Sequence, residues 1–254
     1  MKNTILVLVT VLSALLLVNC STENPVFDPR PTAPSSQQAT AESIPIVKTL
    51  NHTINYLALG DSYTIGQSVC SECKFPEQLQ QSLKNTNTAN TYSLKVIAQT
   101  GWTTTNLISG INKQNLTPNY DLVTLLIGVN NQYQHKSFSI YEKEFPELVN
   151  KSIAFANGDK SKVIVVSIPD YAYTPYGQGS GNSVKISAEI DNYNAFAKKY
   201  CEEYNIAFIN ITDITRKGLA NTDLVAQDGL HPSAKAYSLF VERIAPIAAR
   251  ILNK

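Results

Sequence analysis

The stretch that organises this chain is Ile54-Asn55-Tyr56-Leu57-Ala58-Leu59-Gly60-Asp61-Ser62-Tyr63-Thr64. Its first half is a short apolar run, which predicts a buried strand that ends at Leu59. A glycine, an acid and a serine then follow, at the position where an α/β protein can present a reactive hydroxyl. The alternative for Ser62 is a structural role, because most loop serines cap helices or make turns.

Further apolar runs predict strands at 93–98, 121–127, 162–168 and 206–210. Helices are expected from 76 onward, at 103–112, 140–156 and 184–204, and after Pro232, which is well placed to open the last one. Pro246 should kink or restart that helix. Residues 169–183, which include Tyr171, Tyr173 and Tyr176, are expected to form a long loop. Alternating strands and helices predict an α/β fold, a three-layer α/β/α sandwich with a parallel five-stranded sheet of the flavodoxin-like class.

The N-terminus predicts export. Lys2 precedes an apolar run at 5–18, which is shorter than the roughly 20 residues that span a bilayer and is typical of a signal-peptide h-region. The run ends at Asn19-Cys20, which resembles the bacterial lipobox with a lipidated Cys20, although that pattern prefers a small residue in place of Asn19. The alternatives are a plain signal peptide cut nearby and an uncleaved signal anchor.

Residues 21–50 predict a flexible linker, because five of the 12 prolines lie there and Ser, Thr and Gln fill much of the rest. The expected organisation is a signal peptide at 1–19, a lipidated cysteine and linker at 20–50, and one folded domain at 51–254. A lipid on Cys20 would anchor the protein to the membrane at the bacterial cell envelope.

Charge and cysteine content narrow the function classes. Lys+Arg 21 against Asp+Glu 20 leaves no basic footprint for nucleic acid. Cys70-Ser71-Glu72-Cys73 is interpreted as a local disulfide in the loop after Ser62 or as two free thiols, with a redox pair as a further alternative. No second C-x-x-C accompanies it, so a zinc site is not expected. Cys201 falls at an apolar position of a predicted helix and is assigned to the core.

Polar residues suited to ester hydrolysis follow the strands or precede the last helix. Ser62, Gly101 and Asn130 follow the first three strands, and His231 precedes the last helix. We expect these loops to meet, because ligands bind outside the carboxyl ends of the strands in such sheets. Asp228 lies three residues before His231, close enough for its carboxylate to reach the imidazole Nδ1. A turn acid and a helix-entry histidine are the structural alternatives for this pair, and His135 is set aside because no acid is near it.

These residues stand in blocks that resemble the SGNH, or GDSL-type, hydrolase family. The blocks are Gly60-Asp61-Ser62-Tyr63, Gly101 within Gln-Thr-Gly-Trp, Gly128-Val129-Asn130-Asn131 and Asp228-Gly229-Leu230-His231-Pro232. Leu is usual at Tyr63 and Asp is usual at Asn131, so the hydrogen bonding of the Asn131 loop is open. The α/β-hydrolase elbow is not supported, because Thr64 occupies its second glycine position.

The resemblance implies a carboxylic ester hydrolase that needs no metal or organic cofactor. Ser62 would be the nucleophile, His231 the general base and then acid, and Asp228 the residue that orients His231. The backbone N–H groups of Ser62 and Gly101 and the side-chain amide of Asn130 would form the oxyanion hole.

The substrate would be either an acyl lipid, such as a lysophospholipid, or an O-acetylated carbohydrate. The alternative from another class is a non-catalytic envelope lipoprotein that binds glycan or lipid on a hydrolase fold. The Tyr171–Ser183 loop is either a wall of the pocket or a surface loop packed on the sheet edge. The oligomeric state is left open.

Overall fold

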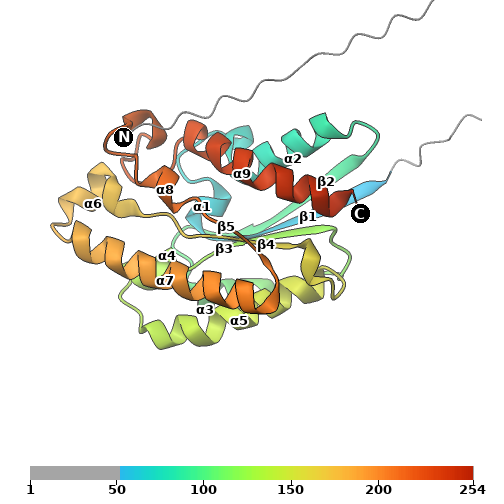
Figure 1. Ribbon diagram of the computed structural model, residues 1–254, viewed down its shortest axis with the longest axis horizontal. Helices are drawn as coiled ribbons and strands as arrows, with labels where there is room; N and C mark the ends of the chain where they lie inside the picture. Colours follow the sequence, from blue (N-terminus) through green and yellow to red (C-terminus); the bar gives the residue numbers. More distant parts are fainter. Residues whose placement is uncertain (1–51, 254) are drawn as a thin grey trace, which may run out of the picture. The chain divides into compact units, whose positions relative to one another are not determined.

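The structure is a computed structural model that describes residues 52–253. The signal peptide, Cys20 and the whole linker predicted above lie outside the described residues. Five described strands form one parallel sheet in the order β2-β1-β3-β4-β5 (Figure 1). This is the 2-1-3-4-5 order of flavodoxin-like sheets, which confirms the predicted fold class. The strands are β1 (Thr53–Gly60), β2 (Thr91–Ala98), β3 (Leu122–Leu126), β4 (Val163–Val166) and β5 (Ala207–Ile209).

Helices cover both faces of the sheet. On one face α2 (Phe75–Thr86) packs against α9 (Ala234–Leu252), and on the other α5 (Phe138–Phe155) packs against α3 (Thr104–Asn112) and α7 (Ser183–Tyr204) (Figure 1). Every residue of β3 and β4 is buried, which explains why these strands are apolar except for Thr124. The remaining short elements are α1 (Ser62–Ile65), η1 (Ser71–Cys73), α4 (Val129–Tyr133), η2 (Lys160–Lys162), η3 (Tyr171–Tyr173), α6 (Pro175–Gly179), α8 (Thr212–Thr215) and η4 (Thr222–Leu224).

The segment 169–183 is not the irregular loop that we expected, because it contains η3 and α6. Local caps account for both turns. The Asp170 carboxylate accepts from the Ala172 N–H at 3.0 Å, and the Thr174 hydroxyl accepts from the Gly177 N–H at 3.1 Å. Pro175 occupies the first position of α6, where its missing N–H needs no partner. Short capped turns have too few residues to show a periodic apolar pattern.

The expectation that Pro232 opens the last helix is wrong, and so is the restart that was one of two alternatives, a kink or a restart, for Pro246. Pro232 does not open α9, because it pairs with Val225 in an isolated antiparallel bridge. Ser233 caps the helix instead, and its hydroxyl accepts from the Ala236 N–H at 3.2 Å. Pro246 does not restart α9, which continues from Ala234 to Leu252. Ile244 and Ala248 flank the proline and are fully buried, so tertiary packing maintains the helix through the lost hydrogen bond.

Candidate active site

One cavity of about 190 Å³ collects the site residues predicted from the loops. Ser62 follows β1, Gly101 follows β2 and Asn130 follows β3, so three neighbouring strands deliver them to the same edge of the sheet. His231 reaches the cavity from the loop before α9. The other lining residues are Tyr63, Thr100, Val129, Tyr133, Tyr171, Tyr176 and Leu230.

Ser62 is held at the first position of α1 by its buried neighbours. The Asp61 carboxylate caps this short helix and accepts from the Tyr63 N–H at 3.0 Å. Gly60 is required before it, because a Cβ there would clash with the Thr64 hydroxyl and the Leu126 carbonyl oxygen. Ser62 itself is buried, with only a small exposed fraction that faces the cavity.

The carboxylate of Asp228 holds the imidazole of His231. Its Oδ2 lies 2.7 Å from His231 Nδ1, and its Oδ1 accepts from the backbone N–H groups of Leu230 and His231, both at 2.9 Å. Because Asp228 is hydrogen-bonded to Nδ1, Nε2 is the ring nitrogen that can exchange a proton with a group in the cavity. The Tyr63 ring packs against the imidazole of His231 with 5.1 Å between centroids. This contact further restricts the orientation of the imidazole.

Ser68 is a contributor that the sequence did not reveal. Its hydroxyl donates to Asp228 Oδ2 at 2.6 Å across 160 positions of chain. Partial burial alone would raise the pKa of Asp228, but the hydrogen bonds from Ser68 and His231 lower it to about 2. The carboxylate therefore stays ionised over the working pH range. The loop that carries Ser68 leads into a disulfide between Cys70 and Cys73, whereas Cys201 is buried and reduced.

Two candidate donors for an oxyanion are positioned by hydrogen bonds to neighbouring residues. The Asn130 amide donates one N–H to the Trp102 carbonyl at 3.1 Å, and the same nitrogen carries a second N–H. Gly101 has a φ of +81°, a conformation that favours glycine, and its carbonyl accepts from Gln134 Nε2 at 2.8 Å.

The adjacent Asn131 has a different role. Its Oδ1 accepts from the Thr104 N–H at 2.9 Å, and its Nδ2 donates to the Thr104 hydroxyl at 2.7 Å. An amide can make both bonds, whereas an ionised carboxylate could only accept. The loop hydrogen bonding left open by the asparagine at this position is therefore supplied by its own side chain.

The side chain of Asp61, next to Ser62, is a buried carboxyl group. It is fully buried, and its Oδ2 has no hydrogen-bond partner. Burial raises the pKa of Asp61 to about 7, against the lowering effect of the Tyr63 N–H and the nearby Asn130 amide. The sequence did not reveal this, because the burial of a turn acid depends on what packs over it.

Tyrosines close one side of the cavity. Tyr133, at the end of α4, and Tyr176, on α6, share a hydrogen bond between their hydroxyl oxygens at 2.5 Å. Tyr171 lies beneath them, and its hydroxyl donates to Gln132 Oε1 at 2.8 Å. Tyr171 and Tyr176 belong to the segment expected as a pocket wall or a surface loop, and both line the cavity. Tyr133 had no predicted role.

Metal-ligand clusters and membrane-spanning helices are both absent from residues 52–253. Within this range no group of three or more His, Cys, Asp or Glu side chains is arranged to hold a metal ion. No helix in the same range is long and apolar enough to cross a membrane.

A family model described as the GDSL-like lipase/acylhydrolase family matches residues 58–239. No curated protein matches the chain. Among solved structures, a member of the lipolytic G-D-S-L family from Veillonella parvula DSM 2008 is 18% identical, with a TM-score of 0.57 over 79% of this chain and 99% of that one.

Two further solved structures are esterases. The acetylxylan esterase Axe2 from Geobacillus stearothermophilus is 17% identical, with a TM-score of 0.59 over 81% of this chain and 97% of that chain. A two-domain esterase active on acetylated mannans is 16% identical, with a TM-score of 0.61 over 81% of this chain and 51% of that one. At these identities the structures establish a shared fold.

Proposed function

The chain belongs to the GDSL-like lipase/acylhydrolase family of carboxylic ester hydrolases, and on this premise we propose that Ser62, His231 and Asp228 act as its catalytic triad. The observation that carries the proposal is the 2.7 Å contact between His231 Nδ1 and Asp228 Oδ2, with His231 and Ser62 lining one cavity. Asp228 keeps Nε2 directed at the reaction, and its charge stabilises the imidazolium that forms.

The reaction is a two-step acyl transfer. Ser62 Oγ attacks the ester carbonyl while His231 Nε2 takes the hydroxyl proton, and the resulting imidazolium then protonates the departing alcohol. Water next attacks the acyl-Ser62 ester and gives its proton to His231, which returns that proton to Ser62 Oγ as the acid is released. The Ser62 and Gly101 backbone N–H groups and the Asn130 amide donate to the oxyanion in both steps.

We infer that the substrate is an O-acetylated carbohydrate rather than an acyl lipid. The catalytic cavity, about 190 Å³, is smaller than the roughly 300–1,000 Å³ of pockets for larger ligands, and this favours a short acyl group. Two proteins of the same fold, described as an acetylxylan esterase and as an esterase active on acetylated mannans, support this class.

Location is a separate proposal. The signal-like segment and Cys20 support an envelope lipoprotein that meets its substrate outside the cytoplasm. Metabolic labelling with an alkyne fatty acid should mark the wild-type chain and fail to mark Cys20→Ser. Equal labelling of both chains would contradict lipidation at Cys20.

The catalytic assignment is tested with Ser62→Ala. We expect hydrolysis of p-nitrophenyl acetate and covalent labelling by a fluorophosphonate probe to be lost together, while the circular dichroism spectrum is unchanged. Ser71→Ala is the matched control, because Ser71 is exposed and lies outside the cavity. Wild-type activity in Ser62→Ala would overturn the nucleophile. A wild-type chain that neither hydrolyses the ester nor reacts with the probe would favour the non-catalytic binding protein.

A further inference from the structure

The catalytic cavity is the first of three neighbouring hollows. A second cavity of about 500 Å³ is also lined by Tyr133, Tyr171 and Tyr176, so these rings form the partition between the two. A third cavity of about 380 Å³ shares His135 with the second. We refer to the second and third cavities as the groove, and to Tyr133 and Tyr176 as the tyrosine pair. The fold thus provides a path that leads away from Ser62.

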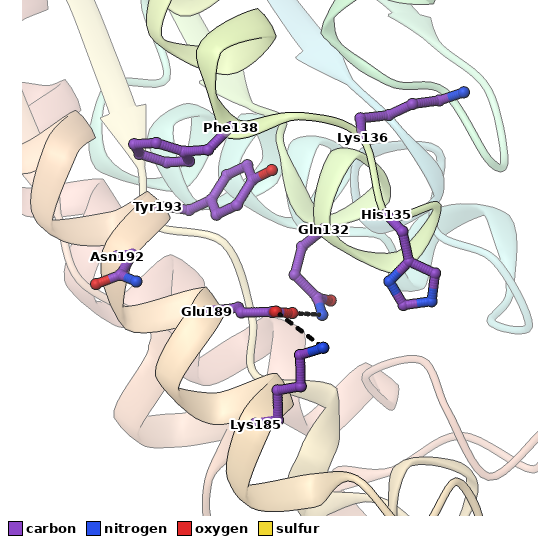
Figure 2. A pocket seen from close by; sticks show the side chains of 8 residues that line it. All are labelled: Gln132, His135, Lys136, Phe138, Lys185, Glu189, Asn192 and Tyr193. Carbon is purple, nitrogen blue, oxygen red and sulfur yellow. Dashed lines mark hydrogen bonds and ion pairs between the residues drawn. The ribbon is translucent and has the colours of Figure 1, made fainter.

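Polar side chains line both cavities of the groove. Ser180 and Asn182 line the second cavity. In the third, Figure 2 shows Gln132, Glu189 and Lys185 facing one another beside His135. Gln132 Nε2 donates to Glu189 Oε2 at 2.7 Å, and Lys185 Nζ lies 3.8 Å from Glu189 Oε1. A hydrocarbon chain laid here would remove these polar groups from water without replacing their hydrogen bonds.

The tyrosine pair adds exposed aromatic surface. Tyr133 is 45% exposed and Tyr176 is 44% exposed, although both belong to the wall of the catalytic cavity. An aromatic ring with one end apolar and one end polar suits a ligand that alternates C–H faces with hydroxyl groups, as a pyranose ring does. The two hydroxyls already meet at the partition.

The groove adjoins the loop that carries His231. The Tyr176 N–H donates to the Gly229 carbonyl at 3.0 Å, which ties α6 to the loop that carries His231. In the mechanism above, His231 protonates the leaving oxygen, so that oxygen must lie beside His231. The remainder of the alcohol then continues past Tyr176 toward the second cavity.

We propose that the groove is a binding site for an oligosaccharide chain that bears the ester, and that Tyr133 and Tyr176 are the specificity-determining residues next to the reacting sugar. The inference rests on the proposed function, because it takes the leaving alcohol to be part of a carbohydrate. It adds that the enzyme recognises several linked sugars rather than the ester alone. His135, which we had set aside because no acid is near it in the sequence, shares the third cavity with Glu189.

Binding is tested without the ester, so that the result does not depend on hydrolysis. Isothermal titration of the full-length chain with xylohexaose, mannopentaose and chitohexaose should show that at least one of them binds. The Tyr133→Ala/Tyr176→Ala variant should weaken that binding by about tenfold or more. Tyr173→Ala is the matched control and should bind as the wild type does, because Tyr173 is 36% exposed in the same segment but packs over Arg216, outside all three cavities.

A kinetic ratio gives a second readout. In the tyrosine-pair variant, kcat/KM for the acetylated form of the oligosaccharide that binds, relative to kcat/KM for p-nitrophenyl acetate, should fall about tenfold, mainly through KM. An unchanged ratio, or no binding of any of the three oligosaccharides at millimolar concentration, would overturn the inference. So would a variant that gains activity on p-nitrophenyl octanoate while its saccharide binding is intact, because the groove would then serve acyl chains. Activity retained in Ser62→Ala would overturn the proposed function and leave the titration result standing.

Discussion

The carboxylate of Asp228 shows how far a single residue can be specified by its surroundings. Ser68, Leu230 and His231 all donate to it, so both oxygens are oriented and the pKa falls to about 2. A fixed, ionised carboxylate sets the tautomer of His231. Asn130 is constrained as well, because the Trp102 carbonyl accepts one of its two amide hydrogens.

Asn130→Ala tests whether the Asn130 amide donates to the oxyanion. We expect kcat for p-nitrophenyl acetate to fall by about 10²–10³, because one oxyanion donor is lost, while KM changes much less. Steady-state kinetics measure both constants. Asn85→Ala, which changes an exposed asparagine on α2, should leave both unchanged. A fall in kcat of less than about threefold would exclude Asn130 from the oxyanion hole.

Several residues of the candidate site lie on the shortest elements of the fold. α1, α4 and η3 are single turns that would not persist as isolated helices. Tertiary bonds maintain them. Arg216 on the α8 side pairs with the buried Asp170 carboxylate at 2.9 Å, which also accepts from the Ser187 hydroxyl at 2.6 Å. These contacts connect the segment 169–183 to α7 and α8.

The Cys70–Cys73 disulfide supports the loop that carries Ser68. Its closed loop is short, so chain entropy predicts a stabilisation of about 2 kcal/mol. We expect Cys70→Ser/Cys73→Ser to lose that amount in urea denaturation and to lower kcat, because Ser68 becomes less well placed against Asp228. Ser71→Ala, in the same turn, controls for the substitution of a polar surface residue. Unchanged stability and kcat would show that other contacts hold this loop.

Two carboxyl groups make the stability of the whole molecule depend on pH, because their pKa values are shifted in opposite directions. The pKa of Asp61 in the folded state, about 7, lies above the value near 3.9 of an unfolded chain. Between about pH 4 and 7 the unfolded state therefore loses this proton first, and stability falls as pH rises. Asp228, with a pKa of about 2, contributes stability that is present above about pH 4 and is lost as pH falls toward 2.

Asp61→Asn tests whether Asp61 makes the free energy of unfolding depend on pH. The amide keeps the acceptor for the Tyr63 N–H and cannot ionise, so the loss of stability between about pH 5 and 7 should become smaller than in the wild type. Urea denaturation at a series of pH values measures the free energy of unfolding. Glu142→Gln, which neutralises an exposed acid, should keep the wild-type slope. A parallel slope in Asp61→Asn would mean that Asp61 is already ionised in the folded protein.

The local pattern was sufficient to predict the sheet and the loops that meet at its edge. Apolar runs define strands by composition alone, and parallel connectivity brings their carboxyl ends together. Ser62, Gly101 and Asn130 each follow such a run directly, so their convergence in one cavity follows from the topology. The pairing of Asp228 with His231 is local as well, because three residues separate them.

Only the tertiary structure decided which distant residues complete the site. Ser68 and Asp228 meet across 160 positions, and Tyr133 and Tyr176 meet across 43. Such contacts depend on how packed segments bring loops together, and no local periodicity encodes that. The burial that raises the pKa of Asp61 has the same origin. The amino-acid sequence by itself determined the fold and the position of the candidate triad, whereas the packing between distant segments decided the pKa values of Asp61 and Asp228 and the groove that leads away from the triad.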